Sequence, residues 1–380
     1  MKRYLVVVAV AVIGLVLASC SLFQKPSLFA DANLESAVRA AIGIPRDELV
    51  PSDVADLREI SVEGLGITDL GGIQYCTGLE VLALRNNDIV DISPLAELTN
   101  LVSLNLYKNY VVDVSPLTKL TKLRTLSLQR NNLTDISPLA GLIDLGWLSI
   151  SNNRVGDIRA LAGLASLHSL YFHDNEIVDI SPLAELTNLT YLHGSGNRIV
   201  DISVMAELEQ LESLYLYDNQ IVDLSSLSRL TDLEAVYLYD NQIVEISPLS
   251  RLTNLEFLYL GNNAIADVRA LERLTRLRTL SMDTNEITDI DSLAGLTNLT
   301  RLYLDHNAIA DISALAGLTK LVMVDLSYNA IADITPLVMN TGLADGDQVR
   351  LEHNQLNTEP SDPDMVFIHS LIQRGVDVRY

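Results

Sequence analysis

The side chains that could do chemistry in this chain are few. It has two cysteines, Cys20 and Cys76, and six histidines. His173 and His193, near Asp174, could contribute to a weak metal site, but no third ligand follows at a suitable spacing, so we expect surface histidines. The sequence has no His-Glu-x-x-His zinc motif, no nucleophile elbow and no phosphate loop. We therefore expect a protein that is not an enzyme and needs no metal or cofactor.

Acidic side chains recur every 22 residues, from Asp69 and Asp91 through Glu245 to Asp333. Carboxylates stacked about 5 Å apart could share calcium ions. Alternatively, each carboxylate caps backbone amides of its own turn, which we favour. The formal net charge is −23, which argues against nucleic acid or an anionic lipid surface as the main partner.

The 22-residue spacing belongs to a repeat that fills most of the chain. It runs without insertion through residues 57–342, which make thirteen units. With 48% hydrophobic residues the chain can bury a large core, whereas two cysteines are too few for a disulfide framework. We number positions 1 to 22 in each unit, starting from Leu57. Stacked units would share one continuous core, since a single unit cannot bury its apolar side chains alone.

Each unit predicts a short strand followed by a turn. Seven positions are apolar, and in the unit that begins at residue 255 they are Leu255, Leu258, Leu260, Ile265, Val268, Leu271 and Leu274. Positions 3 to 7 alternate, so positions 4 and 6 should point inward and positions 3, 5 and 7 outward. The Asp-Ile-Ser-Pro-Leu segment, as at residues 91–95, predicts a helical turn with serine as N-cap and proline at the first helical position.

This pattern resembles leucine-rich repeats of the 22-residue class and is most similar to bacterial internalin-type proteins. The resemblance implies an α/β solenoid: an arc with a parallel β-sheet on the concave face and short helical or extended turns on the convex face. Residues 28–56, with helical spacing at Leu34, Val38 and Ile42, resemble the helical N-terminal cap of internalins. Residues 343–380 would form a degenerate last repeat and a C-terminal cap, including a helix-like stretch at 367–373. Caps matter because an open solenoid end exposes apolar core.

Position 9 is asparagine in twelve of the thirteen units. Its amide can donate to and accept from backbone groups at the turn, so we predict a structural role. The exception is Leu65, and the asparagines are Asn87, Asn109, Asn131, Asn153, Asn175, Asn197, Asn219, Asn241, Asn263, Asn285, Asn307 and Asn329. Cys76 stands at apolar position 20, which predicts a buried thiol.

Aromatic residues concentrate on the outward strand positions. Nine of the 14 tyrosines fall on positions 3, 5 and 7. Rigid amphipathic rings on an exposed sheet favour a recognition surface, although cross-strand packing that stiffens the sheet is the alternative. The candidate ligand-binding residues are Trp147, Tyr171, Tyr191, Tyr215, Tyr217, Tyr237, Tyr239, Phe257, Tyr259 and Tyr303.

The N-terminus has the pattern of an export signal. Lys2 and Arg3 precede an apolar run at residues 5–18, which is short for a membrane span. The Leu-Ala-Ser-Cys order at 17–20 resembles a bacterial lipobox, which implies a signal peptide over 1–19, lipidation of Cys20 and a lipidated tether over 20–27. An ordinary signal peptide or an uncleaved anchor is the alternative. Ser21 resembles the residue found there in lipoproteins sorted to the outer membrane.

Together these features predict an exported, lipid-anchored protein of the bacterial cell envelope, at the outer membrane or cell surface. It would bind a protein ligand through its tyrosine-rich concave face, with adhesion or host interaction as the setting. The alternative is a glycan ligand, since Trp147 and the tyrosines could stack on sugar rings while Asp218 and Asp240 accept hydroxyl hydrogen bonds. Glycan binding should depend on one or two rings, and protein binding on several units.

Overall fold

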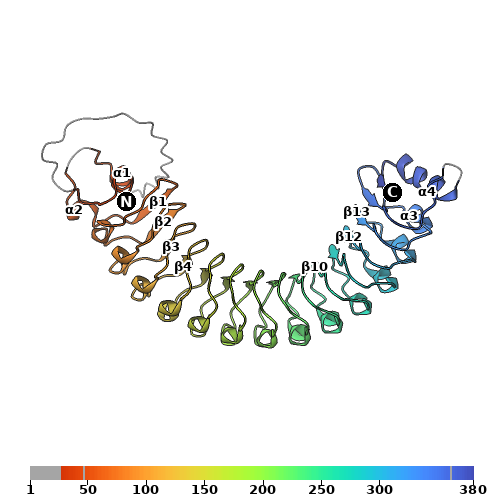
Figure 1. The fold of residues 1–380 in the computed structure, drawn as a ribbon, viewed down its shortest axis with the longest axis horizontal. Helices are drawn as coiled ribbons and strands as arrows, with labels where there is room; N and C mark the ends of the chain where they lie inside the picture. The colour runs from red at the N-terminus through yellow and green to blue at the C-terminus, as the bar shows by residue number, and fades with distance from the viewer. Residues whose placement is uncertain (1–26, 46–47, 360–361) are drawn as a thin grey trace, which may run out of the picture. The chain divides into compact units, whose positions relative to one another are not determined.

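The computed structural model describes residues 27–45, 48–359 and 362–380, which fall into two compact units divided between residues 177 and 178. Each unit is a stack of 22-residue repeats, with parallel strands along one side and short helical turns along the other (Figure 1). The strands lie on the inner side of the curve within each unit, as expected. The predicted signal peptide and Cys20 lie outside the described residues.

The described residues of the N-terminal unit form two α-helices, six strands and several short 3-10 helices. The helices are α1 (Ala32–Ile42) and α2 (Pro51–Val54). Each strand pairs in parallel with the next along the chain, from β1 to β6. The strands are β1 (Glu59–Glu63), β2 (Val81–Arg85), β3 (Ser103–Asn105), β4 (Thr125–Ser127), β5 (Trp147–Ser149) and β6 (Ser169–Tyr171). The 3-10 helices between them are Ile73–Tyr75, Ser93–Leu95, Ser115–Leu117, Ser137–Gly141 and Arg159–Leu161.

The C-terminal unit has the same pattern, with nine strands in the part of it that the structure describes. They are β7 (Tyr191–His193), β8 (Ser213–Tyr215), β9 (Ala235–Tyr237), β10 (Phe257–Tyr259), β11 (Thr279–Ser281), β12 (Arg301–Tyr303), β13 (Met323–Asp325), β14 (Gln348–Arg350) and β15 (Asp377–Arg379). The helices are α3 (Thr335–Met339) and α4 (Pro363–Gln373). The 3-10 helices are Ser181–Leu183, Ser203–Glu207, Ser225–Arg229, Ser247–Arg251, Arg269–Leu271, Asp291–Gly295 and Ser313–Gly317. From β7 to β13 the register shifts by one repeat per strand, so equivalent positions stand side by side.

The core confirms the predicted inward positions. All seven apolar side chains of the repeat that begins at Leu255 are buried, and so are their counterparts in neighbouring repeats. Each fully buried leucine or isoleucine contributes about 1.5–3 kcal/mol, which chain entropy largely offsets. Stability therefore comes from repetition of one packing unit.

The helical N-terminal cap is also present. Asp31 accepts hydrogen bonds from the backbone N–H groups of Asn33 and Leu34 at the start of α1. Leu34 and Val38 are buried, and α1 packs beside β1. Gly43 ends the helix with a left-handed φ of 74°, which glycine adopts without steric cost. The helix therefore covers the first strand of the N-terminal unit.

The predicted serine N-cap is wrong. In the 3-10 helix Ser93–Leu95 the N-cap is Ile92, and no side chain caps it. Instead Oδ1 of Asp91 accepts the N–H of Ser93 at 2.8 Å, and Oδ2 accepts from the Ser93 hydroxyl. Ser93 is already the first residue of the 3-10 helix, so its N–H and hydroxyl both donate to the carboxylate two residues earlier.

The last repeat carries extra residues and a true helix. The predicted helix-like stretch at 367–373 is part of the longer α4, whose N-terminus is capped by Asp362. This helix packs against α3 and β15. Among the described residues, no helix combines the length and the apolar character needed to cross a bilayer.

Candidate binding surface

The asparagines at position 9 connect neighbouring repeats through backbone hydrogen bonds, as predicted. Oδ1 of Asn109 accepts the N–H of Ile89, and its Nδ2 donates to the carbonyls of Leu84 and Leu106. The other repeats show equivalent bonds, for example at Asn285. These amides satisfy groups that the turn would otherwise bury without partners.

The residue just before each asparagine has a left-handed backbone, which sequence reasoning missed. Position 8 has a φ between 48° and 56° in eleven repeats, including Asp218 and Asp240, and Gly196 has 61°. The signal was present, since many of these residues are asparagine, aspartate or glycine, the types that tolerate this conformation. The strand therefore ends in a sharp bend that turns position 8 to the border of the strand face.

Five tyrosines of the C-terminal unit form two stacked rows, which we call the tyrosine face. Tyr215, Tyr237 and Tyr259 occupy position 5 of β8, β9 and β10, with ring centroids 4.4 and 4.5 Å apart and planes within 15° of parallel. Tyr217 and Tyr239 stack in the same way at position 7, at 4.3 Å and 9°. The strand register brings these rings together, because each strand places the same position beside its neighbour. All five rings remain half-exposed.

Burial raises the pKa of two tyrosines in the tyrosine face. Desolvation, followed by the adjacent phenols of Tyr215 and Tyr259, raises the pKa of Tyr237 to about 12. Burial also raises the pKa of Tyr239, with further contributions from Tyr217, Asp240 and Asp218. The phenols of Tyr237 and Tyr239 thus stay protonated at neutral pH, and that of Tyr239 lies near the carboxylates of Asp218 and Asp240.

The remaining predicted aromatics lie on the strand face outside these two rows. In the N-terminal unit Trp147 and Tyr171 lie 5.3 Å apart with planes tilted by 44°. In the C-terminal unit Tyr191 contacts Tyr215 at 5.2 Å, also tilted. Phe257 and Tyr303 are half-buried on β10 and β12. The structure therefore gathers the densest stacking on β8, β9 and β10.

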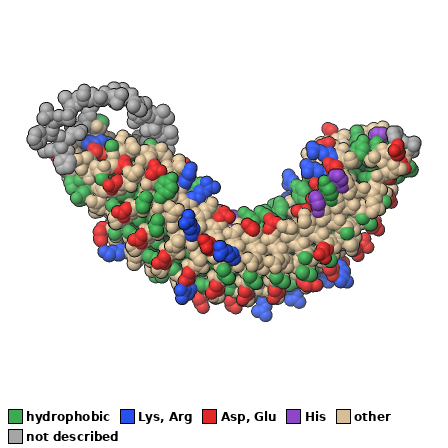
Figure 2. Space-filling view, viewed as in Figure 1, with side chains coloured by type: hydrophobic (Ala, Val, Ile, Leu, Met, Phe, Trp, Pro, Cys, Tyr) green, Lys and Arg blue, Asp and Glu red, His purple; other side chains and the backbone are tan. Residues whose placement is uncertain are grey.

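The aspartates at position 13 form hydrogen bonds within the turns. Each of the twelve aspartates accepts the backbone N–H two residues further on, as Asp179 does from Ser181. Carboxylates recur along this turn side in Figure 2. No cluster of three or more His, Cys, Asp or Glu side chains in the described part of the chain is arranged to hold a metal ion. These contacts confirm the capping interpretation.

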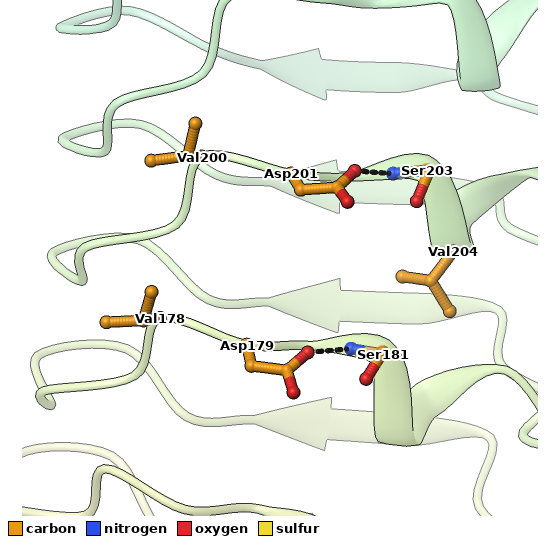
Figure 3. A pocket seen from close by; sticks show the side chains of 7 residues that line it. All are labelled: Val178, Asp179, Ser181, Val200, Asp201, Ser203 and Val204. Atoms are coloured by element: carbon orange, nitrogen blue, oxygen red, sulfur yellow. Dashed lines mark hydrogen bonds between the residues drawn. The ribbon is translucent and has the colours of Figure 1, made fainter.

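A shallow pocket lies between two turns of the C-terminal unit. Val178, Val200 and Val204 line it together with Asp179 and Asp201 (Figure 3). The carboxylates of Asp179 and Asp201 already accept the N–H groups of Ser181 and Ser203. The pocket therefore offers mainly apolar contact.

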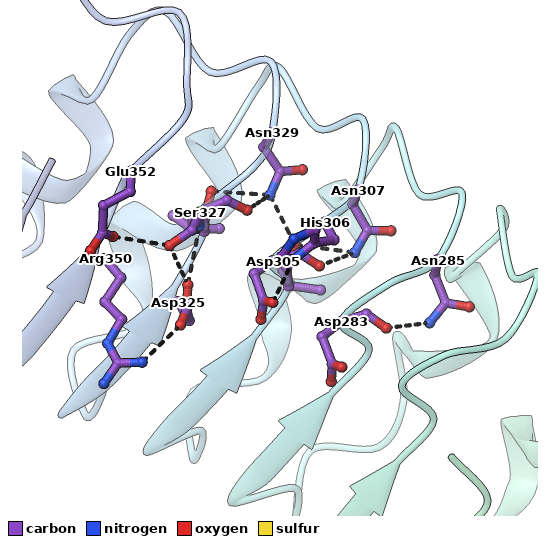
Figure 4. A network of polar contacts seen from close by, with 12 residues as sticks. Asp283, Asn285, Asp305, His306, Asn307, Asp325, Ser327, Asn329, Arg350 and Glu352 are labelled. Atoms are coloured by element: carbon purple, nitrogen blue, oxygen red, sulfur yellow. Dashed lines mark hydrogen bonds and ion pairs between the residues drawn. The ribbon is translucent and has the colours of Figure 1, made fainter. Parts of the chain in front are cut away.

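A polar network occupies the strand side near the C-terminus. Asp325 accepts hydrogen bonds from the Ser327 hydroxyl and pairs with Arg350 at 3.3 Å (Figure 4). His306 contacts the Asp305 carboxylate at 3.0 Å, and its ring stacks on Tyr328 at 4.1 Å. Burial, more than the neighbouring carboxylates, raises the pKa of Asp305. Here carboxylates have cationic or hydroxyl partners within the protein.

The three candidate reactive residues have ordinary environments. Cys76 is fully buried, and desolvation raises the pKa of its thiol to about 12, which confirms the predicted buried cysteine. His173 contacts the carboxylate of Asp174 at 2.9 Å, and His193 lies 2.7 Å from the Ser195 hydroxyl. Both histidines are half-buried on the strand side.

Comparison with known proteins agrees with the repeat pattern. Models described as "Leucine Rich repeats (2 copies)" match residues 77–119, 99–141, 209–251 and 253–295, and a "Leucine rich repeat" model matches 275–331. No curated protein matches the chain.

Comparison with solved structures also identifies leucine-rich repeat proteins as similar to this chain. An internalin (inlF) from Listeria monocytogenes is 32% identical with a TM-score of 0.81, over 89% of this chain and 100% of that one. A leucine-rich repeat protein of Leptospira interrogans is 21% identical with a TM-score of 0.70, over 87% and 97%. The functional domain of InlJ from Listeria monocytogenes is 22% identical with a TM-score of 0.63, over 85% and 81%. The Leptospira protein and InlJ share the fold of this chain.

Proposed function

Since the chain belongs to the internalin-like leucine-rich repeat proteins, we propose that it is a non-catalytic binding protein whose tyrosine face recognises a protein ligand. Its biological setting would be the bacterial cell envelope, where lipidated Cys20 anchors the exported chain. Adhesion or interaction with a host would be its role.

The observation that carries this proposal is the pair of stacked tyrosine rows. Five half-exposed rings are held at stacking distance, three at the ends of β8, β9 and β10 and two just after β8 and β9. Stacking restricts the rings before any ligand arrives, so less side-chain entropy is lost on binding. Each phenol adds a polar group to a large apolar surface, which is typical of residues that dominate protein interfaces.

The turn side offers less for recognition. Its aspartates are engaged with backbone amides, and its pocket is shallow and mainly apolar. Exposed valines stand at position 12 of four successive repeats, Val178, Val200, Val222 and Val244, but they offer small β-branched side chains without polar groups rather than large rings. The strand face is therefore the better candidate for a specific partner.

The experiment compares the full chain in detergent with a variant in which Tyr215, Tyr217, Tyr237, Tyr239 and Tyr259 are alanine. Both are applied to arrays of bacterial proteins, host proteins and glycans. A control variant replaces Tyr75 and Tyr110, which are exposed outside the strand face. A protein captured by the wild type and the control, and lost by the five-tyrosine variant, supports the proposal. Capture that survives the five substitutions contradicts it, provided that the variant's circular dichroism spectrum is unchanged.

Glycan binding remains the second candidate, because Trp147 and Tyr171 form a separate tilted pair in the N-terminal unit. A flat indole is well suited to stacking on a sugar ring. In that case Trp147→Ala alone would abolish capture on the glycan array, and the five-tyrosine variant would still bind.

A further inference from the structure

The tyrosine face lacks cationic side chains. We consider positions 3, 5, 7 and 8 in the four repeats that begin at residues 211, 233, 255 and 277. None of these sixteen residues is lysine or arginine, and three are aspartate: Asp218, Asp240 and Asp283. Elsewhere these positions do carry cations, as at Arg85, Lys108 and Arg130, so the absence is local.

Carboxylates border the tyrosine face on both sides. Asp218 and Asp240 directly follow Tyr217 and Tyr239, at the left-handed bend where the strand face ends. Glu212 and Glu234 stand at position 2, just before β8 and β9, and both are exposed. We call these four residues the acidic borders. They enclose the stacked rings between two short rows of negative charge.

The glutamates of the acidic borders differ from their counterparts in other repeats. At the same position 2, Glu80 pairs with Arg58 at 2.8 Å, and Glu256 pairs with Arg278 at 2.9 Å. Each of those arginines comes from an adjacent repeat. Glu212 and Glu234 have no such ion pair among the described residues, because position 2 of the flanking repeats holds Thr190 and glutamates. The two exposed carboxylates are therefore open to a cationic partner.

One end of the tyrosine face carries a further carboxylate. Position 7 changes from Tyr239 to Gly261 and then to Asp283. The Asp283 carboxylate extends over Gly261, where an added Cβ would lie 2.5 Å from its Oδ1. The Ser281 hydroxyl donates to that oxygen at 2.6 Å. The row of rings thus ends beside an oriented negative charge.

From this arrangement we propose that the partner of the tyrosine face is a basic polypeptide segment, whose arginine or lysine side chains lie along the rings and pair with the acidic borders. The inference rests on the proposed function and names the chemistry of its ligand. Arginine suits the site best, because its planar guanidinium is weakly hydrated, packs on aromatic surfaces and pairs with carboxylates. A neutral glycan could offer hydroxyl groups to Asp218 and Asp240 but no positive charge to pair with the acidic borders.

The direct test uses a fluorescent peptide of alternating arginine and glycine, with a matched peptide that carries neutral citrulline in place of arginine. Binding to the full chain in detergent is measured by fluorescence anisotropy at low and at physiological salt. The charge variant combines Glu212→Gln, Glu234→Gln, Asp218→Asn and Asp240→Asn, so all rings stay in place. The matched control combines Glu207→Gln, Glu209→Gln, Asp232→Asn and Glu272→Gln, which removes the same charge from exposed residues outside the tyrosine face.

We expect the arginine peptide to bind the wild type and the matched control alike, and the charge variant about tenfold more weakly. Binding of the citrulline peptide should be weak to all three, and salt should weaken arginine binding. Equal loss in both variants would mean attraction to net charge alone, and would overturn the proposal. Absence of arginine-peptide binding, or equal binding of the citrulline peptide, would overturn it as well.

The two proposals can fail separately. A protein from the array that is lost with the tyrosine substitutions, yet binds the charge variant fully and is insensitive to salt, leaves the proposed function intact and contradicts the basic partner. A protein that binds regardless of the tyrosine substitutions contradicts the proposed function itself. A protein lost in both the tyrosine and charge variants, and retained by the matched control, supports both.

Discussion

The carboxylate of Asp283 lies in the space that a side chain at Gly261 would need. A Cβ added to Gly261 would approach Oδ1 of Asp283 to 2.5 Å and its Cγ to 2.8 Å. Neither contact involves the backbone of another repeat, so the conflict is with the end of one flexible side chain. Because residue 261 is glycine, the Asp283 carboxylate can occupy the space beside the position-7 row of tyrosines, which ends at Tyr239.

Gly261→Ala should therefore displace the Asp283 side chain and break its hydrogen bond with Ser281. We expect a loss of about 1 kcal/mol in the free energy of unfolding, the usual net value of one such bond. Gly163→Ala is the control, since an added Cβ there meets nothing within 4 Å. That variant should be as stable as the wild type or slightly more stable. Chemical denaturation of both variants checks this, and identical midpoints would contradict the expectation.

Asn109→Ala should be much more damaging. It would leave the N–H of Ile89 and the carbonyl of Leu84 buried without their amide partner, at about 1–3 kcal/mol for each group. The control is Asn100→Ala, because Asn100 is half-exposed and donates to the Thr77 carbonyl at 3.0 Å. Native-state hydrogen exchange at Ile89 is the measurement, since it reports opening of a single repeat. Unchanged protection of Ile89 in Asn109→Ala would refute the structural role.

Acid should destabilise the protein through the aspartates of position 13. The backbone N–H groups of Ser115 and Ser203 lower the pKa of Asp113 and Asp201, and hydrogen bonds from Arg269 lower the pKa of Asp267 to about 2. A lowered native-state pKa gives stability that is present above the unfolded-state pKa of about 4 and is lost as pH falls through the native value.

The combined variant Asp113→Asn and Asp201→Asn removes two of these titrations. The midpoint of urea denaturation, measured from pH 5 down to about pH 2, should fall less steeply than in the wild type. Glu207→Gln with Glu209→Gln serves as the control and should retain the wild-type slope. A variant curve parallel to that of the wild type would show that these carboxylates do not couple to folding.

High pH should destabilise the protein through the tyrosine face. The pKa of Tyr237 is raised to about 12, chiefly by burial and then by Tyr215 and Tyr259. The native state therefore holds this proton more tightly than the unfolded state, and stability falls as pH rises from about 10 to about 12. Tyr237→Phe should reduce that fall and remove one late step from the tyrosinate absorbance titration. Tyr110→Phe, at a ring that is 53% exposed, should leave the late step in place.

Much of the architecture could be predicted because it repeats. Alternation at positions 3 to 7 predicted the strands, and the buried positions followed from their spacing. The asparagine at position 9 was also predictable, since an amide needed twelve times points to the backbone rather than to a reaction. The turn was predicted less well: Ser93 does not cap the helix, and instead its own N–H donates to Asp91. A helix start leaves more than one plausible capping side chain, and only the local geometry chooses between them.

The sequence predicted which positions form the candidate site, but it did not predict how their rings are oriented relative to one another. Ten aromatic residues at outward positions were candidates, yet among them the parallel stacks involve only Tyr215, Tyr237 and Tyr259 in one row and Tyr217 and Tyr239 in the other. Trp147 and Tyr171 are tilted instead. Ring orientation depends on the side chains of both neighbouring repeats, which periodicity alone does not describe.

The sequence by itself determined the repeat, the inward and outward positions, the asparagine column and the buried Cys76, because each follows from the local periodicity of one chain. Tertiary structure alone decided the two tyrosine stacks and the place of the Asp283 carboxylate over Gly261. These features arise between repeats, where side chains more than 20 residues apart come into contact. Their geometry is set by strand spacing and by what the adjacent repeat carries.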